Sequence, residues 1–84
     1  MNRVRGHLLR LAARVRAATG RRDSYGYLPA ILELLEEMER CLQKGRPTRE
    51  RLSRGLGRLV MESVEFSESR LGSDLVRFAD EYEA

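Results

Sequence analysis

Arginine is the residue type whose placement in this sequence bears most directly on chemistry. Fifteen of the sixteen basic residues are arginines, and most of them fall in two stretches. Residues 1–22 hold seven arginines and no acid, and residues 44–58 hold six basic residues against one acid. A guanidinium group is always charged and offers planar pairs of N–H donors to carboxylate and phosphate oxygens. The two stretches therefore indicate binding of an anionic partner.

Helical spacing arranges some of these arginines into two rows. In a helix over residues 3–19, three arginines fall within a narrow arc opposite the apolar residues. In a helix over residues 48–65, three more recur at i, i+3 and i+7 on the outer face. The six arginines of these rows are the candidate partner-binding residues: Arg3, Arg10, Arg14, Arg51, Arg54 and Arg58. We expect them to bind an acidic protein partner.

Nucleic-acid binding through the same two rows is the alternative interpretation. Residues 45–59, GRPTRERLSRGLGRL, place a glycine-containing turn before an arginine-rich helix, as helix-turn-helix motifs do. However, Arg46 and Thr48 stand in the turn, where that motif has an apolar residue, and the preceding helix is long and acidic. Arginine rows of this kind supply phosphate contacts and little base readout. Membrane binding is also disfavoured, because the apolar face of residues 3–19 lacks the Trp or Phe that membrane-surface helices carry.

Residues suited to catalysis or metal binding are few and unfavourably spaced. The only histidine, His7, has no candidate partner in the sequence, and HExxH, CxxC and glycine-rich phosphate-loop motifs are absent. Glu36 and Glu37 look like a carboxylate pair, but adjacent helix positions point about 100° apart and cannot converge on one substrate. We therefore expect a non-enzymatic protein without a metal or a cofactor.

The elements that position these arginines are predicted from apolar periodicity. The broadest apolar face lies within residues 28–42, and Leu34 and Cys41 widen it. The residues at its centre are Leu28, Ile31, Leu35, Met38 and Leu42. So broad a face is too large for one partner helix, so this segment should be the spine of a bundle.

Breaks at glycine and proline divide the chain into helices. Gly20 ends the first helix, Gly45 and Pro47 end the second, and Thr48 is an N-cap for the third. The expected helices cover residues 3–19, 27–44, 48–65 and 69–83. Their short connections predict an all-α fold, a small antiparallel bundle of three to four short helices. One domain spans residues 1–84, with a basic amphipathic helix in 1–22 and a helical core over 27–83.

Further expectations concern glycines inside the third helix and serines before the last helix. Gly55 and Gly57 in the third helix predict either a tight crossing with a neighbouring helix or a locally irregular segment. Ser67 or Ser69 is the predicted N-cap of the last helix, with Glu68 in its first turn.

Two further expectations concern the tyrosines before the second helix and the acidic residues near the end of the sequence. Tyr25 and Tyr27 are expected to close one end of the core. Asp80, Glu81 and Glu83 lie at a helix C-terminus, where the macrodipole disfavours them, so we expect them to lie near arginines of the first helix in the same or a second copy.

Chain length and composition suggest the oligomeric state and the compartment. A domain of 84 residues buries a modest share of its surface, so we expect self-association, as a homodimer. A single cysteine excludes an internal disulfide, which favours a cytoplasmic location. An arginine-rich, acid-poor start also fits an organellar transit peptide, a less favoured alternative. No apolar run approaches the length of a membrane span.

Overall fold

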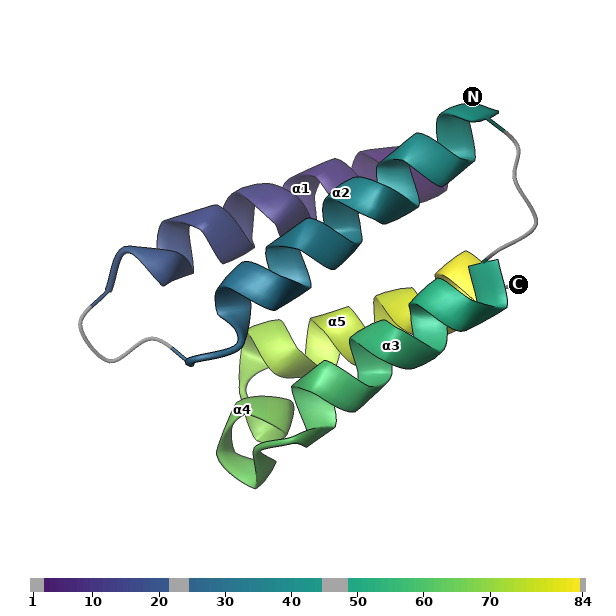
Figure 1. The fold of residues 1–84 in the computed structure, drawn as a ribbon. Coiled ribbons are helices and arrows are strands. Elements are labelled where there is room, and N and C mark those ends of the chain that lie inside the picture. Colours follow the sequence, from purple (N-terminus) through teal and green to yellow (C-terminus); the bar gives the residue numbers. More distant parts are fainter. Residues whose placement is uncertain (1–2, 22–24, 45–48, 84) are drawn as a thin grey trace.

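The computed structural model describes residues 3–21, 25–44 and 49–83 and shows helices without strands in these ranges (Figure 1). Gly45, Pro47 and Thr48, which were expected at the second joint, lie outside the described residues. The predicted all-α fold is confirmed. The helices of the described ranges are α1 (Arg3–Thr19), α2 (Leu28–Lys44), α3 (Arg49–Met61), α4 (Val64–Glu68) and α5 (Arg70–Glu83).

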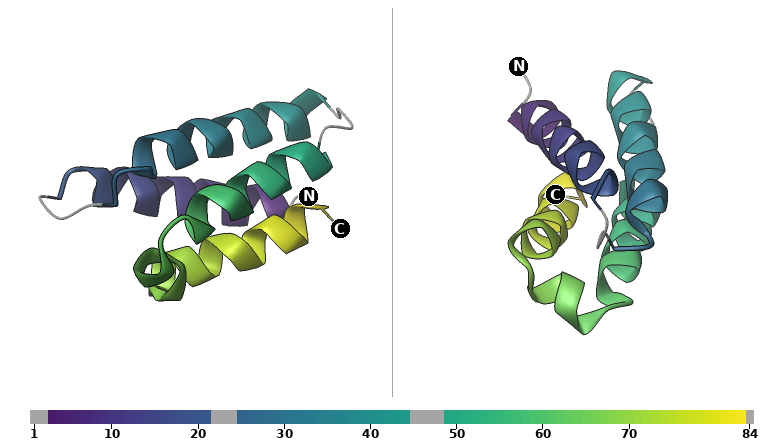
Figure 2. Two further views of the ribbon diagram at one scale, coloured as in Figure 1. Left: turned by 60° about the horizontal axis from the view of Figure 1, so that its bottom comes forward. Right: turned by 90° about the vertical axis from the view of Figure 1, so that its left-hand side faces the viewer.

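The four longer helices form an antiparallel bundle, and the five-residue α4 joins α3 to α5. Helix α1 packs against α2 and α5, and α3 packs against the same two helices. Helices α1 and α3 therefore lie diagonally across the bundle, as do α2 and α5 (Figure 2). The molecule measures 36 × 20 × 18 Å along its principal axes. The bundle architecture follows from short connections between amphipathic helices.

The predicted spine of the bundle is confirmed. Four of the five central residues of α2 are buried, and Leu42 at the far end is half-buried against the core. Helix α5 supplies the largest buried side chains, Phe78 and Tyr82. The Tyr82 hydroxyl donates a hydrogen bond to the Met38 carbonyl at 3.0 Å, across the diagonal of the bundle. This bond satisfies a buried polar group that would otherwise cost free energy.

The third helix ends earlier than predicted. Helix α3 stops at Met61, and Ser63 takes an extended conformation (φ −127°, ψ 123°) as the N-cap of the additional helix α4. The Ser63 hydroxyl accepts a hydrogen bond from the Phe66 amide at 3.2 Å. Val64, which falls within the predicted helix over residues 48–65, is therefore 72% exposed. The local cap outweighs the apolar periodicity, which continues past the break.

One of the two predicted caps of the last helix is confirmed. The Ser69 hydroxyl accepts a hydrogen bond from the Gly72 amide at 3.0 Å and so caps α5. Ser67 and Glu68 lie in α4 instead, so the prediction that Glu68 occupies the first turn of the last helix is wrong. Helix α4 makes the turn between α3 and α5, and Ser67 and Glu68 form its last two residues.

Close backbone approach occurs at a different glycine from those predicted. Helix α3 is regular through Gly55 and Gly57. A Cβ on Gly55 would make an ordinary contact with Leu34, 3.5 Å away, and one on Gly57 would meet open space. A Cβ on Gly72 would overlap the Phe66 carbonyl oxygen and lie 2.8 Å from its carbon. Gly72 therefore lets α4 fold back onto the first turn of α5.

The two tyrosines before α2 have different environments. Tyr25 stacks on Phe66 with ring centroids 4.3 Å apart and donates a hydrogen bond to the Leu59 carbonyl at 2.7 Å. Burial raises the pKa of the Tyr25 phenol, and the Glu62 carboxylate adds to the rise. Tyr25 closes this end of the core as predicted, whereas Tyr27 packs edge-on against it and remains 48% exposed.

Candidate anion-binding surface

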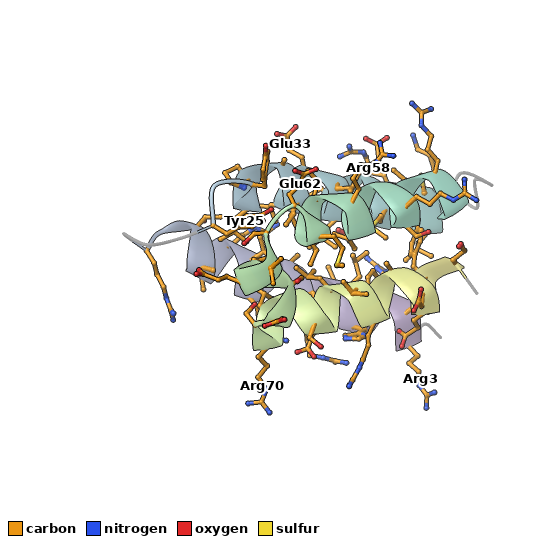
Figure 3. All side chains as sticks on the ribbon, turned by 90° about the horizontal axis from the view of Figure 1, so that it is seen from below. Arg3, Tyr25, Glu33, Arg58, Glu62 and Arg70 are labelled. Carbon is orange, nitrogen blue, oxygen red and sulfur yellow. The ribbon has the colours of Figure 1, made fainter. Side chains whose placement is uncertain are left out.

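The two predicted arginine rows lie on separate surfaces. Because α1 and α3 are diagonal, the row on one helix cannot extend the row on the other. Figure 3 shows Arg3 of α1 and Arg58 of α3 projecting from opposite sides of the bundle. The structure therefore does not bring the six candidate residues together into one site.

The row on α3 is exposed. Arg51, Arg54 and Arg58 lie on the face of α3 opposite the buried residues Leu56 and Val60. This placement agrees with the predicted outward row. It is a narrow strip of three arginines along a single helix.

The arginines of α1 are divided between its two neighbours. Toward α5, Arg14 donates a hydrogen bond to Asp74 at 2.7 Å. Toward α2, Arg5 lies 3.6 Å from Glu39 and Arg16 lies 3.3 Å from Glu36. The remaining predicted members of the row, Arg3 and Arg10, are exposed and form no ion pair with any residue in the described part of the chain.

The acidic end of the chain meets α1, although not in the predicted pairing. Glu81 Oε1 lies 3.2 Å from Nδ1 of His7, a residue that had no candidate partner in the sequence. Asp80 and Glu83 are exposed, and neither pairs with an arginine within the described ranges. The arginine contact comes from Asp74, nearly two turns earlier in α5. Glu81 thus contacts α1 within one chain, but its partner there is His7 and not one of the predicted arginines.

The hydrogen bond from Arg14 lowers the pKa of the Asp74 carboxyl, and burial opposes this shift. The charges of Arg14, Arg77 and Arg70 lower it further. Since three arginines act on one carboxylate, the surroundings of Asp74 are dominated by positive charge.

These groups belong to a surface that we call the basic α1/α5 face. Arg10 belongs to it because it shares a narrow arc of α1 with Arg3 and Arg14, and Arg77 belongs to it because its charge acts on Asp74. Arg3 and Arg70 project from the same side of the bundle (Figure 3). The members of the face are Arg3, Arg10, Arg14, Arg21, Arg70 and Arg77. Asp74 and Glu81 are the acids that contact α1 there.

A pocket of about 320 Å³ opens at one end of this face. Two of its arginines, Arg21 and Arg70, were not among the predicted site residues. Arg21 follows the end of α1, and Arg70 begins α5 in the acid-rich part of the sequence. An antiparallel pairing of the first and last helices would have indicated their proximity. The lining residues are Arg14, Ala17, Ala18, Arg21, Arg70 and Leu71.

Comparisons with protein families, with curated proteins and with solved structures find no match for this chain. Within the described residues, no group of three or more His, Cys, Asp or Glu side chains is placed to hold a metal ion. None of the helices in the described ranges combines the length and apolar character needed to cross a membrane.

Proposed function

We propose that this chain is a small non-enzymatic interaction or regulatory protein that binds an acidic segment of another protein along the basic α1/α5 face. The observation that carries the proposal is the charge of that face, where six arginines are accompanied by two acids in contact with α1. The α3 row is a lesser candidate because it has three arginines on one helix. We also propose a cytoplasmic location, because a single cysteine excludes an internal disulfide.

An acidic protein segment suits this face better than a nucleic-acid backbone does. The carboxylates of Asp74 and Glu81 stand among the arginines and would repel a continuous line of phosphates. Ala17, Ala18 and Leu71 line the pocket together with the arginines and offer apolar surface there. A segment that alternates carboxylates with aliphatic side chains would match both features. The diagonal placement of the two rows also prevents one straight duplex from contacting both.

The affinity of such a face depends on several weak contacts acting together. Each exposed ion pair contributes about 0–1 kcal/mol, and salt screens it. The combined field accelerates encounter and selects orientation more than it adds affinity. We therefore expect modest binding that weakens as the salt concentration rises.

A direct test compares two double variants that remove the same charge. Binding of a fluorescent peptide rich in glutamate and leucine is followed by anisotropy at low salt. Arg3→Gln with Arg10→Gln should weaken binding by up to roughly thirtyfold, since two exposed pairs contribute up to about 1 kcal/mol each. Arg51→Gln with Arg58→Gln, on α3, is the control and should leave binding nearly unchanged.

Two outcomes of this test would contradict the proposal. Equal losses in the two double variants would show that binding follows net charge rather than the α1/α5 face. Tighter binding of a nucleic acid of equal charge, at matched salt, would favour the alternative partner.

We also propose self-association as a homodimer, through the joint between α3 and α4. Met61 and Val64 are the most exposed of the large apolar residues in the described chain, at 63% and 72%. Burial against a second copy would remove this surface from water and support a domain of small size. Mass determination in solution across a range of concentration and salt tests this. Met61→Lys with Val64→Lys should give a monomer; a wild-type chain that is monomeric at high concentration would contradict the proposal.

A further inference from the structure

The pocket at one end of the basic α1/α5 face is lined by three arginines and three apolar residues. Arg14 comes from α1, Arg21 from the residues just after it, and Arg70 from the start of α5. Its volume of about 320 Å³ is at the lower end of the range for small-molecule sites. Residues far apart in the sequence thus bring three arginines to the lining of one pocket.

The charges of this pocket are only partly compensated. Asp74 accepts a hydrogen bond from Arg14 at 2.7 Å, which offsets that charge and fixes the position of the guanidinium group. Arg21 and Arg70 are exposed and have no acidic partner within 4.0 Å among the described residues. Within the described residues, neither charge is therefore neutralised by a direct ion pair, although Asp74 acts on Arg70 at longer range.

We propose that this pocket binds the dianionic phosphate group of a phosphate monoester. A phosphate monoester carries a charge of about −1.5 to −2 at neutral pH and presents three acceptor oxygens. That charge matches the pair Arg21 and Arg70. A carboxylate carries one charge and two oxygens, so it would match only one of these two cations. The phosphate oxygens also suit the forked donors of arginine.

The rest of the ester is positioned by the apolar lining of the pocket. Ala17, Ala18 and Leu71 offer apolar atoms there, against which the carbon attached to the ester oxygen packs. Arg14 can donate further hydrogen bonds, since a guanidinium group has five N–H groups and the bond to Asp74 uses one. Asp74 opposes binding because its negative charge lies beside the site.

This inference rests on the proposed function, in that the acidic segment would carry the phosphate on one of its side chains. Inorganic phosphate or a small phosphate ester supplies the same chemistry from another source. The experiment therefore needs separate arms for inorganic phosphate and for a phosphoserine peptide.

Amide chemical shifts of Ala17, Ala18 and Leu71 report binding directly. The protein is titrated with sodium phosphate at pH 7.5 and constant ionic strength, and with sodium acetate as the singly charged comparison. Saturable shifts with phosphate and none with acetate are expected. Arg21→Gln with Arg70→Gln should abolish them, whereas Arg51→Gln with Arg58→Gln, which removes the same charge from α3, should leave them unchanged.

A gain of affinity provides a second, independent test. Asp74→Asn should tighten phosphate binding by roughly fifteen- to thirtyfold, the effect of removing one negative charge about 4 Å in water from a phosphate group of charge about −1.5 to −2. Glu37→Gln makes the same change in net charge on α2, where Glu37 pairs with Arg40, and should have little effect. A melting curve for each variant shows that it is folded. Equal affinities in the two variants would overturn the assignment of the pocket.

The outcomes separate this inference from the proposed function. Unshifted amides with phosphate, together with binding of the glutamate-rich peptide, would overturn the phosphate site and leave the proposed function in place. Phosphate binding without peptide binding would support the site and overturn the protein partner. Tighter binding of the phosphoserine peptide than of inorganic phosphate would assign the source to a modified protein.

Discussion

Replacement of Gly72 by alanine should destabilise the protein, although alanine is the better helix former. In an exposed helix interior the exchange favours the folded state by about 1 kcal/mol. Here the new Cβ would overlap the Phe66 carbonyl oxygen, which belongs to the backbone and cannot rotate away. Overpacking of this kind costs about 1–3 kcal/mol, and a shift of the first turn of α5 would weaken the Ser69 cap, worth about another 1 kcal/mol. The net expectation is a loss of about 1–3 kcal/mol.

Gly57 provides the matched control, because a Cβ there meets nothing within 4 Å. Gly57→Ala should stabilise the protein by about 0.5–1 kcal/mol. Thermal and urea unfolding followed by circular dichroism measures both variants. In a domain of this size 1 kcal/mol shifts Tm by about 4–8 °C, so the two changes should move Tm in opposite directions. If Gly72→Ala were as stable as the wild type, the packing of α4 on α5 described here would be wrong.

Three further predictions concern the core and the α1–α5 contact. Leu35→Ala should destabilise by about 2–5 kcal/mol in urea unfolding, because the side chain is fully buried at the centre of α2; an unchanged midpoint would contradict this placement. Tyr82→Phe should cost about 1 kcal/mol in the same assay, since it removes the hydrogen bond to the Met38 carbonyl while keeping the ring. The pKa of Asp74 is lowered in the folded state, so its stabilising contribution is present above the unfolded pKa near 3.8 and is lost as pH falls through the folded value. Unfolding measured between neutral and strongly acidic pH should show that Asp74→Asn loses part of this acid-dependent stability, and identical pH profiles would refute the contribution of Arg14.

The helices and their inward faces could be predicted because they depend on local spacing. The three- and four-residue spacing of Leu28, Ile31, Leu35 and Met38 identifies a buried helix face, whichever helix packs against it. The end of α3 could not be predicted in this way, since Val64 continues the apolar pattern while Ser63 breaks the helix. A capping hydrogen bond and the need to turn toward α5 decided the boundary.

The anion-binding surface could be predicted only in part, because its members meet through the tertiary fold. Arg14 and Asp74 are sixty positions apart, and His7 and Glu81 are seventy-four apart. Spacing along one helix identifies an arginine row but not the helix beside it. The pocket formed with Arg21 and Arg70 depends on the pairing of α1 with α5, which no local pattern encodes.

The hydrogen bond between Tyr82 and Met38 has a practical consequence for shortened versions of the chain. Terminal residues are usually dispensable because few contacts hold them. Here Tyr82, only two positions before Ala84, is completely buried and bonded across the bundle. Deleting residues back through Tyr82 would therefore remove a core residue. Such a deletion would also remove Glu81, which contacts α1, so any loosening of α1 would have two causes. The single substitution Glu81→Gln removes the carboxylate that contacts α1 and leaves Tyr82 in place. Added sequences such as tags should follow residue 84 and should not replace the residues before it.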